Sequence, residues 1–360
     1  MVGAGIVGAS VAYHLARAGM PVTLIERTEP AAGATGRSFA WIGESGGDWP
    51  GGAEDLRSSV LADYHRLESE IPGVAVRWTG SLDWTGAAVR PGDGAGPGKH
   101  GRQQVERPRI QALEPRLREV PEHAVYAATD GGVDPVGVTE AMVDSARRLG
   151  ARVVLGSAVT SLSIDRGRVT GVITSEGYHA ASTVVLAAGA GVTALGRLAG
   201  VTLPVAASPA VLVHLAAPAG LIRTIVATPD FEARELRPGH LLMTAPSADP
   251  QVVEHAVDLL RATFWDAESV RVLGWAVGDR PMPAHGPVMG YLAPDRSTYV
   301  AVTHSAITLA PTVGRLVAHE LVTGRAAPEL HRCRPGRTGG RPEGDRTGRG
   351  HRWRCVTGRC

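Results

Sequence analysis

The residues at the start of the chain have the types and spacing needed to bind a diphosphate. Gly3, Gly5 and Gly8 follow the pattern G-x-G-x-x-G. In this pattern the first glycine makes a tight turn out of a strand. The second lets a diphosphate approach the backbone, and the third lets a helix lie close on the strand. The amides and the positive dipole end of that helix would face the phosphates. Glu26, at the end of the next strand, would accept hydrogen bonds from ribose hydroxyls.

The alternative is an ordinary glycine-rich turn before a buried helix. The surrounding sequence favours the dinucleotide site, because an apolar helix pattern, its stop at Gly19, a following strand and a terminal acid stand in the expected order. One feature departs from the pattern. Only Met1 and Val2 precede Gly3, whereas a strand usually has about five or six residues. Either the start of the protein lies upstream of Met1, or this chain has lost most of its first strand.

The elements that must position these residues are helices alternating with short strands. Apolar periodicity predicts helices over 9–18, 53–71, 136–149 and 250–264, and a turn at 304–311 leading into a helix that Gly324 ends. Strands are expected at 152–155, 159–164, 169–174, 183–187 and 299–303, and a strand pair at 74–84. Residues 85–107 have the composition of a long loop, and the Arg/Gly-rich residues 334–360 that of a disordered tail.

A second glycine-rich segment, 33–47, allows two interpretations. It is either a surface loop or a second backbone cradle for the cofactor, with Arg37 near the phosphates or the ring, and we favour the cradle. The aromatic residues Trp41, Trp49 and Tyr64 either line a substrate pocket or pack in the core.

Composition excludes several classes of function. With 360 residues and 44% apolar content, the chain can form two domains with cores of their own. A net charge of +2 gives no electrostatic reason to expect nucleic acid. No apolar run approaches the roughly 18 residues that a membrane span needs, and the N-terminus lacks the basic region of a signal peptide. A cytoplasmic protein is therefore expected.

The histidines and cysteines do not predict a metal site. The three cysteines all lie at position 333 or later, which argues against a disulfide framework, a cysteine metal site or a cysteine nucleophile in the body of the chain. His240 and His255 stand alone, and no His/Asp/Glu spacing indicates metal ligands. A structural role is the expectation for both histidines.

Several dispersed motifs together resemble the D-amino-acid oxidase family of FAD-dependent oxidoreductases, which includes glycine oxidase and sarcosine oxidase. The resemblance covers about residues 1–333. It includes the glycine triplet with Glu26, and the later motifs at 33–37, 112–115, 130–135, 185–190, 278–281 with 286–290, and 304–311. Each motif alone is modest, and their common order makes the match specific.

The resemblance implies an α/β (α+β) fold, in which a Rossmann-like FAD-binding domain and an antiparallel-sheet substrate domain are both discontinuous in sequence. We expect the FAD-binding domain at 1–50, 133–205 and 275–333, the substrate domain at 51–132 and 206–274, and the disordered tail at 334–360.

The resemblance also implies which residues hold the cofactor. Those assigned to FAD are Gly3, Gly5, Ile6, Val7, Gly8, Glu26, Arg27, Thr35, Gly36, Arg37, Ser38, Val159, Ala188, Gly189, Ser305, Ala306, Ile307 and Thr308. The family's covalently flavinylated members use a cysteine near the Arg-Pro motif. Here Met282 follows Pro281, so non-covalent FAD is expected.

Two residues are expected to act on the substrate or next to the ring. Arg280 stands in the motif where glycine and D-amino-acid oxidases place a carboxylate-binding arginine, and a guanidinium pairs with a carboxylate through two parallel hydrogen bonds. The alternative for Arg280 is a surface or interdomain salt bridge. His304 either makes a polar contact near the flavin or is structural. His285 stands where the family often has aspartate, and Ala306 where relatives often have glycine.

The resemblance implies hydride transfer from the carbon beside an amine to FAD, imine hydrolysis, and reoxidation of the flavin by O2 to give hydrogen peroxide. The expected substrate is a small amino acid or secondary amine. Two alternatives stay open: a dehydrogenase that passes electrons to another acceptor, and a non-catalytic, truncated relic of the family. A nicotinamide-dependent dehydrogenase is disfavoured because no second dinucleotide fingerprint is present.

Overall fold

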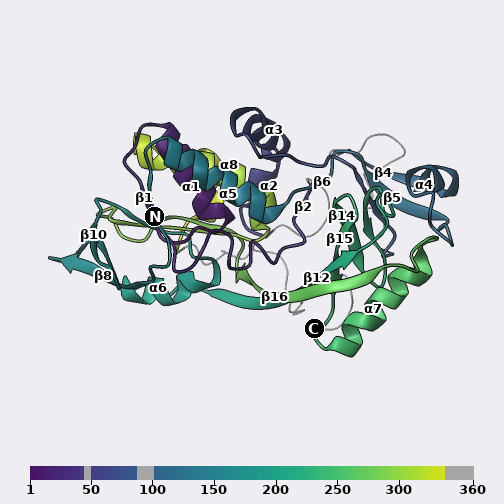
Figure 1. Ribbon diagram of the computed structural model, residues 1–360. Helices are drawn as coiled ribbons and strands as arrows, with labels where there is room; N and C mark the ends of the chain where they lie inside the picture. Colours follow the sequence, from purple (N-terminus) through teal and green to yellow (C-terminus); the bar gives the residue numbers. More distant parts are fainter. Residues whose placement is uncertain (44–49, 87–100, 337–360) are drawn as a thin grey trace, which may run out of the picture.

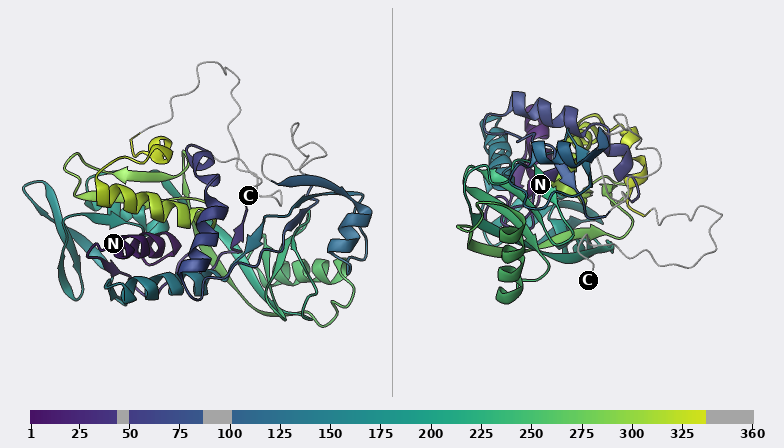
Figure 2. Two further views of the ribbon diagram at one scale, coloured as in Figure 1. Left: turned by 90° about the horizontal axis from the view of Figure 1, so that it is seen from above. Right: turned by 90° about the vertical axis from the view of Figure 1, so that its right-hand side faces the viewer.

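The computed structural model describes residues 1–43, 50–86 and 101–336. Within these ranges the chain forms two lobes (Figure 1). The first lobe contains the glycine triplet together with the first and the last α-helix of the described chain. The second lobe is built on an eight-stranded sheet. The view from above shows long strands running from the first lobe into the second (Figure 2). The expected α/β fold class, with a Rossmann-like nucleotide lobe, is confirmed.

The nucleotide lobe has a mostly parallel sheet with Val2 at its centre. The order is β7 (Arg152–Val154), β1 (Thr23–Ile25), Val2, β11 (Val184–Leu186), β18 (Thr298–Val302) and β17 (Val288–Tyr291), of which only β17 is antiparallel. Val2 bridges Ile25 on one side and Leu186 on the other. The short first strand therefore occupies the central position that the fold requires, through backbone hydrogen bonds to both neighbours.

Alternate residues of this sheet point to two different layers. One layer holds α1 (Ile6–Arg17), α5 (Pro135–Arg148) and α8 (Ala306–Thr323), which lie side by side in Figure 1. Leu24, Val185 and Tyr299 pack into that layer. The opposite layer contains β8 (Val159–Asp165), β9 (Arg168–Thr174), β10 (Gly177–Ala180) and α6 (Val192–Leu198), against which the sheet residues Ile25 and Val300 pack.

The second lobe has an eight-stranded sheet with one long edge strand. Its order is β16 (Arg271–Pro283), β12 (Val205–Ala216), β15 (His240–Ala245), β14 (Glu232–Arg237), β13 (Ile225–Ala227), β3 (Ser81–Asp83), β5 (His123–Ala127) and β4 (Arg102–Glu106). Every neighbouring pair is antiparallel except β13 with β3. The helices α7 (Pro250–Thr263) and α4 (Arg107–Leu113) cover one face and share a core with it. The other face, called here the inner face, carries Arg234, Glu232 and Arg280.

Short elements connect the two lobes. These are β2 (Trp41–Ile42) paired with β6 (Gly131–Gly132), α2 (Ala53–Arg57), α3 (Val60–Glu70), and the 3-10 turns η1 (Gly189–Gly191) and η2 (Pro328–Cys333). The helices α3 and α8 pack together through Tyr64, which is fully buried.

Several sequence expectations need correction. The helix predicted over 53–71 is two helices, interrupted at Ser58 and Ser59. The strand pair predicted at 74–84 is a single strand, β3, which pairs with β5 and β13, both distant in sequence. The expected loop 85–107 contains β4, because β5 supplies a hydrogen-bonding partner for its polar sequence; residues 87–100 of that loop lie outside the described ranges.

Two expected domain boundaries fall within strands. The division at 205/206 lies at the start of β12, and the one at 274/275 lies inside β16. The expected tail begins within the fold, since Arg334 pairs with Glu320 of α8. Cys333 is buried next to Gly52. The remaining tail residues, 337–360, lie outside the described part of the chain.

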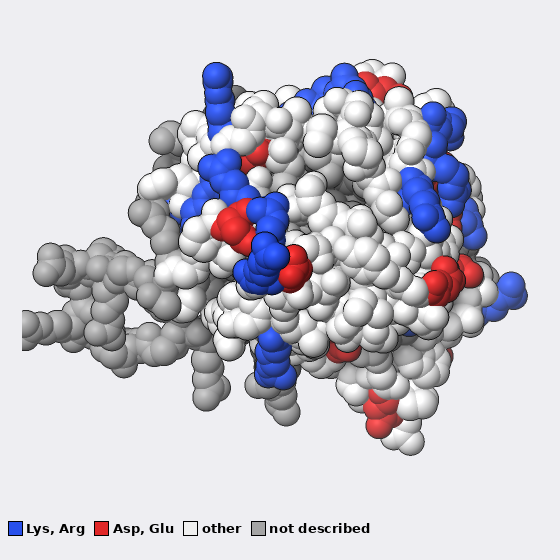
Figure 3. All heavy atoms as spheres, turned by 90° about the vertical axis from the view of Figure 1, so that its left-hand side faces the viewer, with Lys and Arg blue, Asp and Glu red and all other residues white. Residues whose placement is uncertain are grey.

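The surface shows charges of both signs. On the end of the molecule that carries β8 and β10, basic side chains lie in short clusters with acidic ones among them (Figure 3). No helix in the described ranges is long and apolar enough to cross a membrane.

Candidate functional site

The three glycines of the first motif have the conformations and contacts that their spacing predicts. Gly3 has a φ of +100°, and a Cβ on it would lie 2.7 Å from the carbonyl oxygen of Ala187. A Cβ on Gly8 would collide with the carbonyl oxygen of Gly3, so only glycine lets α1 lie this close to the strand. A Cβ on Gly5 would meet only the Thr35 hydroxyl, at 3.1 Å. The space over Gly5 is therefore open to a ligand.

The start of α1 has unused hydrogen-bond donors. Ile6 donates its amide to the hydroxyl of Thr35 at 3.1 Å. The amides of Val7 and Gly8 make no hydrogen bond within the described ranges. Because the first turn of a helix carries a partial positive charge, this open end suits a diphosphate. The residues present thus fit the dinucleotide that the sequence motif predicts.

Glu26 links the first strand to the second at the edge of this opening. One carboxylate oxygen accepts the amide of Ala4 at 2.8 Å, and the other accepts the amide and the hydroxyl of Thr28 at 3.1 and 3.3 Å. Each carboxylate oxygen can accept two hydrogen bonds, so one or more sites stay open for hydroxyl donors. Glu26 thereby fixes the turn after Gly3 and keeps acceptor capacity for a further donor.

The other residues assigned to the cofactor come from four segments. Gly36 and Arg37 lie in the turn after β1, where a Cβ on Gly36 would meet the carbonyl of Ala31 and where Arg37 lies against Gly278 of β16. Arg27 and Arg37 are exposed, and the hydroxyl of Ser38 accepts the amide of Ala40 at 3.1 Å. Val159 begins β8, and Ala188 and Gly189 follow β11.

The start of α8 is held to the connecting elements α3 and β2 by two hydrogen bonds. Ser305 is the N-terminal flanking residue of α8, and Ala306 begins the helix. The buried hydroxyl of Tyr64 donates to the carbonyl of Ile307 at 2.5 Å, and Thr308 donates to the carbonyl of Trp41 at 3.0 Å. Tyr64 is therefore a core residue that holds the start of α8. Trp49, which was likewise expected to line a pocket or to pack in the core, lies outside the described residues.

Arg280 has a guanidinium that no carboxylate of the described residues neutralises. Its Nη2 donates to the Ser208 hydroxyl at 2.9 Å, across the β16–β12 pair. In the described part of the chain it forms no ion pair. The alternative that Arg280 forms a surface or interdomain salt bridge is therefore not supported by the described residues. The guanidinium is available to an acid from outside the chain.

His304 is a neutral residue next to this charge. Burial, together with the positive charge of Arg280, lowers the pKa of His304 to about 4. A neutral imidazole can donate one hydrogen bond and accept one. Near pH 7 the His304 ring is therefore neutral and does not add a second cation beside Arg280.

Arg234 connects the inner face to the nucleotide lobe. It is 2% exposed; its Nε donates to the carbonyl of Phe39 at 2.7 Å, and its Nη2 to the carbonyl of Val133 at 2.6 Å. Gly132 leaves the room for it, since a Cβ there would lie 2.6 Å from Nη1. Burial lowers the pKa of Arg234 to about 10, so the guanidinium stays charged near pH 7.

Sequence reasoning missed two acids on the same inner face. Glu232 lies directly opposite Ala227 of β13, which in turn lies opposite Asp83 of β3. Burial and the negative charge of Asp83 raise the pKa of Glu232 to about 7, against the opposing effect of Arg280. The signal in the sequence was the alternation of charged Glu232 and Arg234 with the apolar Phe231 and Ala233, which places both charges on one face of a strand.

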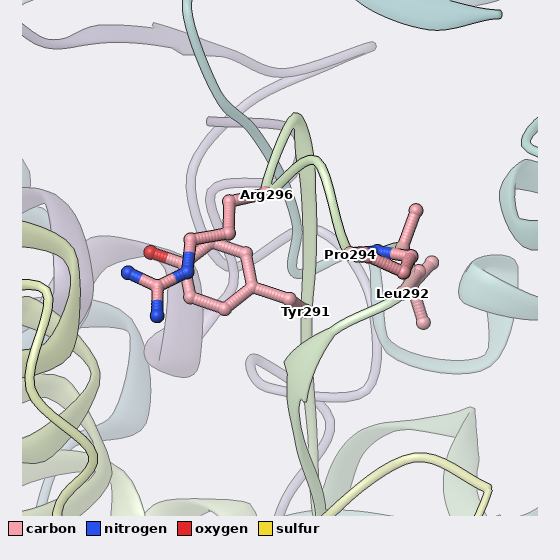
Figure 4. A pocket seen from close by; sticks show the side chains of 5 residues that line it. Tyr291, Leu292, Pro294 and Arg296 are labelled. Carbon is pink, nitrogen blue, oxygen red and sulfur yellow. The ribbon is translucent and has the colours of Figure 1, made fainter.

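A separate hollow lies at the turn between β17 and β18. It is lined by Tyr291, Leu292, Ala293, Pro294 and Arg296. The guanidinium of Arg296 lies over the ring of Tyr291, 5.4 Å from its centre (Figure 4). None of the residues assigned to cofactor or substrate lines this hollow.

Comparison with known proteins gives consistent results along most of the chain. A family model described as FAD dependent oxidoreductase matches residues 1–320. Glycine oxidase from Pseudomonas aeruginosa is 27% identical over 367 residues, which covers 90% of this chain and 94% of that protein. Mitochondrial dimethylglycine dehydrogenase from Homo sapiens is 31% identical over 214 residues, or 57% of this chain, but this is only 24% of that protein's length.

The solved structures show the same fold. The crystal structure of glycine oxidase from Bacillus cereus superposes with a TM-score of 0.77 at 21% identity, covering 91% of this chain and 95% of that one.

Proposed function

This chain belongs to the FAD dependent oxidoreductase family, and we propose that it oxidises the C–N bond of a small amino acid or secondary amine. The observation that carries the proposal is the open guanidinium of Arg280 on the inner face, beside neutral His304. An uncompensated, partly buried cation is costly unless an anion completes it, and a substrate carboxylate has the matching geometry.

The cofactor of this family is FAD. In our proposal the open start of α1, with Gly5, Val7 and Gly8, holds the diphosphate, and Glu26 holds the ribose. The segments of Thr35–Ser38, Val159, Ala188–Gly189 and Ser305–Thr308 complete the cofactor site. The chemistry that FAD supplies when bound is acceptance of a hydride from the carbon beside the amine. Met282 directly follows Pro281, and no cysteine is near it in the sequence, so we propose non-covalent binding.

The chain's own residues then have three tasks. Arg280, oriented by Ser208, fixes the substrate carboxylate and so the position of the adjacent carbon. Neutral His304 contributes a hydrogen bond without a charge. The start of α8, held by Tyr64 and Thr308, presents amides whose partial positive charge stabilises developing negative charge nearby.

The experiment that tests the proposal is the visible absorbance of the purified protein during anaerobic addition of D-amino acids, glycine, sarcosine and proline in separate pools. A flavin spectrum that one pool bleaches supports amine oxidation. Release of the flavin by acid precipitation supports non-covalent binding. A flavin spectrum that no pool bleaches would contradict the proposed substrate class. If the protein took up no FAD, the proposal that this chain is an FAD-dependent enzyme would be wrong.

The electron acceptor defines a second candidate. We propose O2 with release of hydrogen peroxide, supported by the match to a glycine oxidase along 90% of the chain. The partial match to dimethylglycine dehydrogenase favours a different acceptor. A peroxide assay after substrate addition in air, compared with reduction of an artificial dye under anaerobic conditions, separates the two.

A further inference from the structure

The inner face of the large sheet carries an acid whose carboxylate has no partner among the residues that the structure describes. Glu232 begins β14, and its backbone amide donates to the hydroxyl of Thr244 on β15. Its side chain makes no hydrogen bond or ion pair with any residue in the described ranges, although its backbone lies within a continuous sheet. The residue as a whole is half-buried, and burial is the main cause of the raised pKa of its carboxyl.

The strand register places this acid on the same face as Arg280. Direct cross-strand partners share a face, and so do residues two apart in a strand. Glu232 is on the face of Ala227 and Asp83, and of Arg234 two residues later. On the other side, Arg234 lies opposite Leu242 of β15, and Thr244 is two residues further along that strand. Thr244 lies opposite Leu212 of β12, which lies opposite Ala276 of β16. Arg280 is four residues beyond Ala276 and therefore on the same face. The opposite face packs against α7.

The charged groups around Glu232 come from several elements. Arg280 on β16 favours its ionised form, and Asp83 on β3 disfavours it. Asp83 is itself turned toward other partners: it accepts the amide and hydroxyl of Thr85 at 2.9 and 2.7 Å, and lies 3.9 Å from Arg102 of β4. Arg234, on the same strand, is engaged by the carbonyls of Phe39 and Val133. His304 is neutral near pH 7.

Within the described ranges Arg280 and Glu232 form no ion pair, and they have opposite signs. Arg234 forms no ion pair there either, but two backbone carbonyls accept its hydrogen bonds. Arg280 and Glu232 are close enough to affect one another. An unpaired charge on a partly desolvated face is unfavourable. A ligand that carries one negative and one positive group would complete both.

We propose that Glu232 is the counter-ion of the substrate's ammonium group, so that Arg280 and Glu232 together select a zwitterionic amino acid over a carboxylate without a charged nitrogen. This inference rests on the proposed function, because it names the form in which that substrate binds. The substrate class is an α-amino acid or N-alkyl amino acid whose nitrogen is protonated on arrival. A neutral amine, or an acid that lacks nitrogen, leaves one of the two charges without a partner.

Two non-oxidisable probes of equal size test the inference. 2-Aminoisobutyrate carries an ammonium group and a carboxylate, but it has no hydrogen on the carbon beside the nitrogen. Pivalate has a methyl group in place of the ammonium. Calorimetric titration of each into the FAD-loaded protein between pH 6 and 8.5 measures binding without turnover.

The wild-type protein should give opposite pH dependences for the two probes. As pH rises through 7, Glu232 ionises; 2-aminoisobutyrate should bind more tightly, while pivalate should weaken by up to about tenfold per pH unit. Glu232→Gln should remove both trends and weaken 2-aminoisobutyrate at pH 8 by about tenfold or more. For each probe, the affinity should change with pH around one midpoint. Asp83→Asn should move both of these midpoints to lower pH, because it removes the negative charge that opposes ionisation of Glu232.

Asp230→Asn is the matched control, since Asp230 is exposed two residues from Glu232 and loses the same charge. It should leave both midpoints unchanged. Parallel pH trends for the two probes, unchanged trends in Glu232→Gln, or failure of 2-aminoisobutyrate to bind the wild type would overturn the inference. Binding of 2-aminoisobutyrate without any binding of pivalate would support the selection of the zwitterion.

The outcomes separate this inference from the proposed function. Opposite trends without bleaching by any amine would support the zwitterion site and contradict the oxidation. Bleaching with parallel trends would support the oxidation and contradict the role of Glu232.

Discussion

Arg280 and Ser208 lie directly opposite each other on β16 and β12, and the Ser208 hydroxyl accepts a hydrogen bond from Arg280 Nη2 at 2.9 Å. A hydroxyl orients a guanidinium without neutralising it. Across the rest of the described fold, most arginines with short contacts pair with a carboxylate, as Arg315 does with Asp63. The pairing of Arg280 with serine therefore keeps a full positive charge available on the inner face.

The first prediction concerns this charge. Arg280→Gln should weaken pivalate binding at pH 6 by about 10- to 100-fold, since a charge-assisted hydrogen bond contributes roughly 1.5–3 kcal/mol. Arg280→Lys should recover only part of the loss, because an ammonium lacks the planar fork. Ser208→Ala should weaken pivalate binding by less than about fivefold. Calorimetry measures all three, and an equal loss in Ser208→Ala would show that the guanidinium does not itself bind the carboxylate.

The second prediction separates two glycines of one motif. Gly8→Ala should destabilise the protein itself, because the added methyl collides with the carbonyl of Gly3 in the backbone. Gly5→Ala should leave the unfolding temperature of the FAD-free protein nearly unchanged, because its methyl meets only the Thr35 hydroxyl at 3.1 Å. It should nevertheless weaken FAD binding, because the methyl occupies the space over the backbone.

Thermal unfolding of the FAD-free protein and fluorescence titration with FAD measure these two effects. Gly19→Ala is a useful comparison: Gly19 has a positive φ, unlike Gly5 and Gly8, and its Cβ would meet nothing within 4 Å. It should be mildly destabilising and should not change FAD affinity. If Gly5→Ala bound FAD as tightly as the wild type, the diphosphate would have to lie elsewhere.

The third prediction concerns the buried Arg234. Arg234→Met should lower the free energy of unfolding by about 3 kcal/mol, because two charged hydrogen bonds, to the carbonyls of Phe39 and Val133, are lost. Urea unfolding measures the change. Arg271→Met removes an exposed arginine at the start of β16, and should alter stability by less than about 0.5 kcal/mol. Similar effects for the two variants would mean that Arg234 does not hold the lobes together.

The fourth prediction is a pH dependence of stability. Burial lowers the pKa of His14 to about 4, with Arg66 contributing in the same direction. The His14 Nδ1 lies 2.8 Å from the Ser10 carbonyl, and its Nε2 lies 3.3 Å from Arg66 Nη2. Neutral His14 satisfies both contacts by donating from Nδ1 and accepting at Nε2. A proton on Nε2 would remove the second.

The direction of the pH dependence follows from the protonation of His14 in the folded and the unfolded state. Between pH 6.5 and 4 the unfolded chain binds a proton at His14 that the folded chain does not, so stability should fall as pH falls through this range. His14→Gln should reduce the loss between pH 7 and 5 by about 2 kcal/mol. Urea unfolding at several pH values measures it. His319→Gln, at an exposed position on α8, should keep the wild-type slope; an identical slope in His14→Gln would contradict the assignment.

The sequence determined the nucleotide lobe because its signals are local. Gly3, Gly5 and Gly8 form one short pattern, in which Gly8 packs on the carbonyl of Gly3 five residues before it, and Glu26 follows from the strand after the first helix. The helices α1, α5, α7 and α8 were recognised for the same reason: apolar spacing over more than ten residues is a property of one segment. Family motifs in a fixed order then predicted the fold class and the cofactor, and the comparisons confirmed both.

Only the tertiary structure decided how the substrate face is assembled. β3 pairs with strands that begin 42 and 144 residues beyond its own first residue, at His123 and Ile225, and no local pattern specifies such pairings. Whether Arg280 is neutralised, and whether Glu232 shares its face, depends on the register of six neighbouring strands. These charges come from segments far apart in sequence, and their mutual positions follow from long-range pairing and packing, which a linear pattern does not contain.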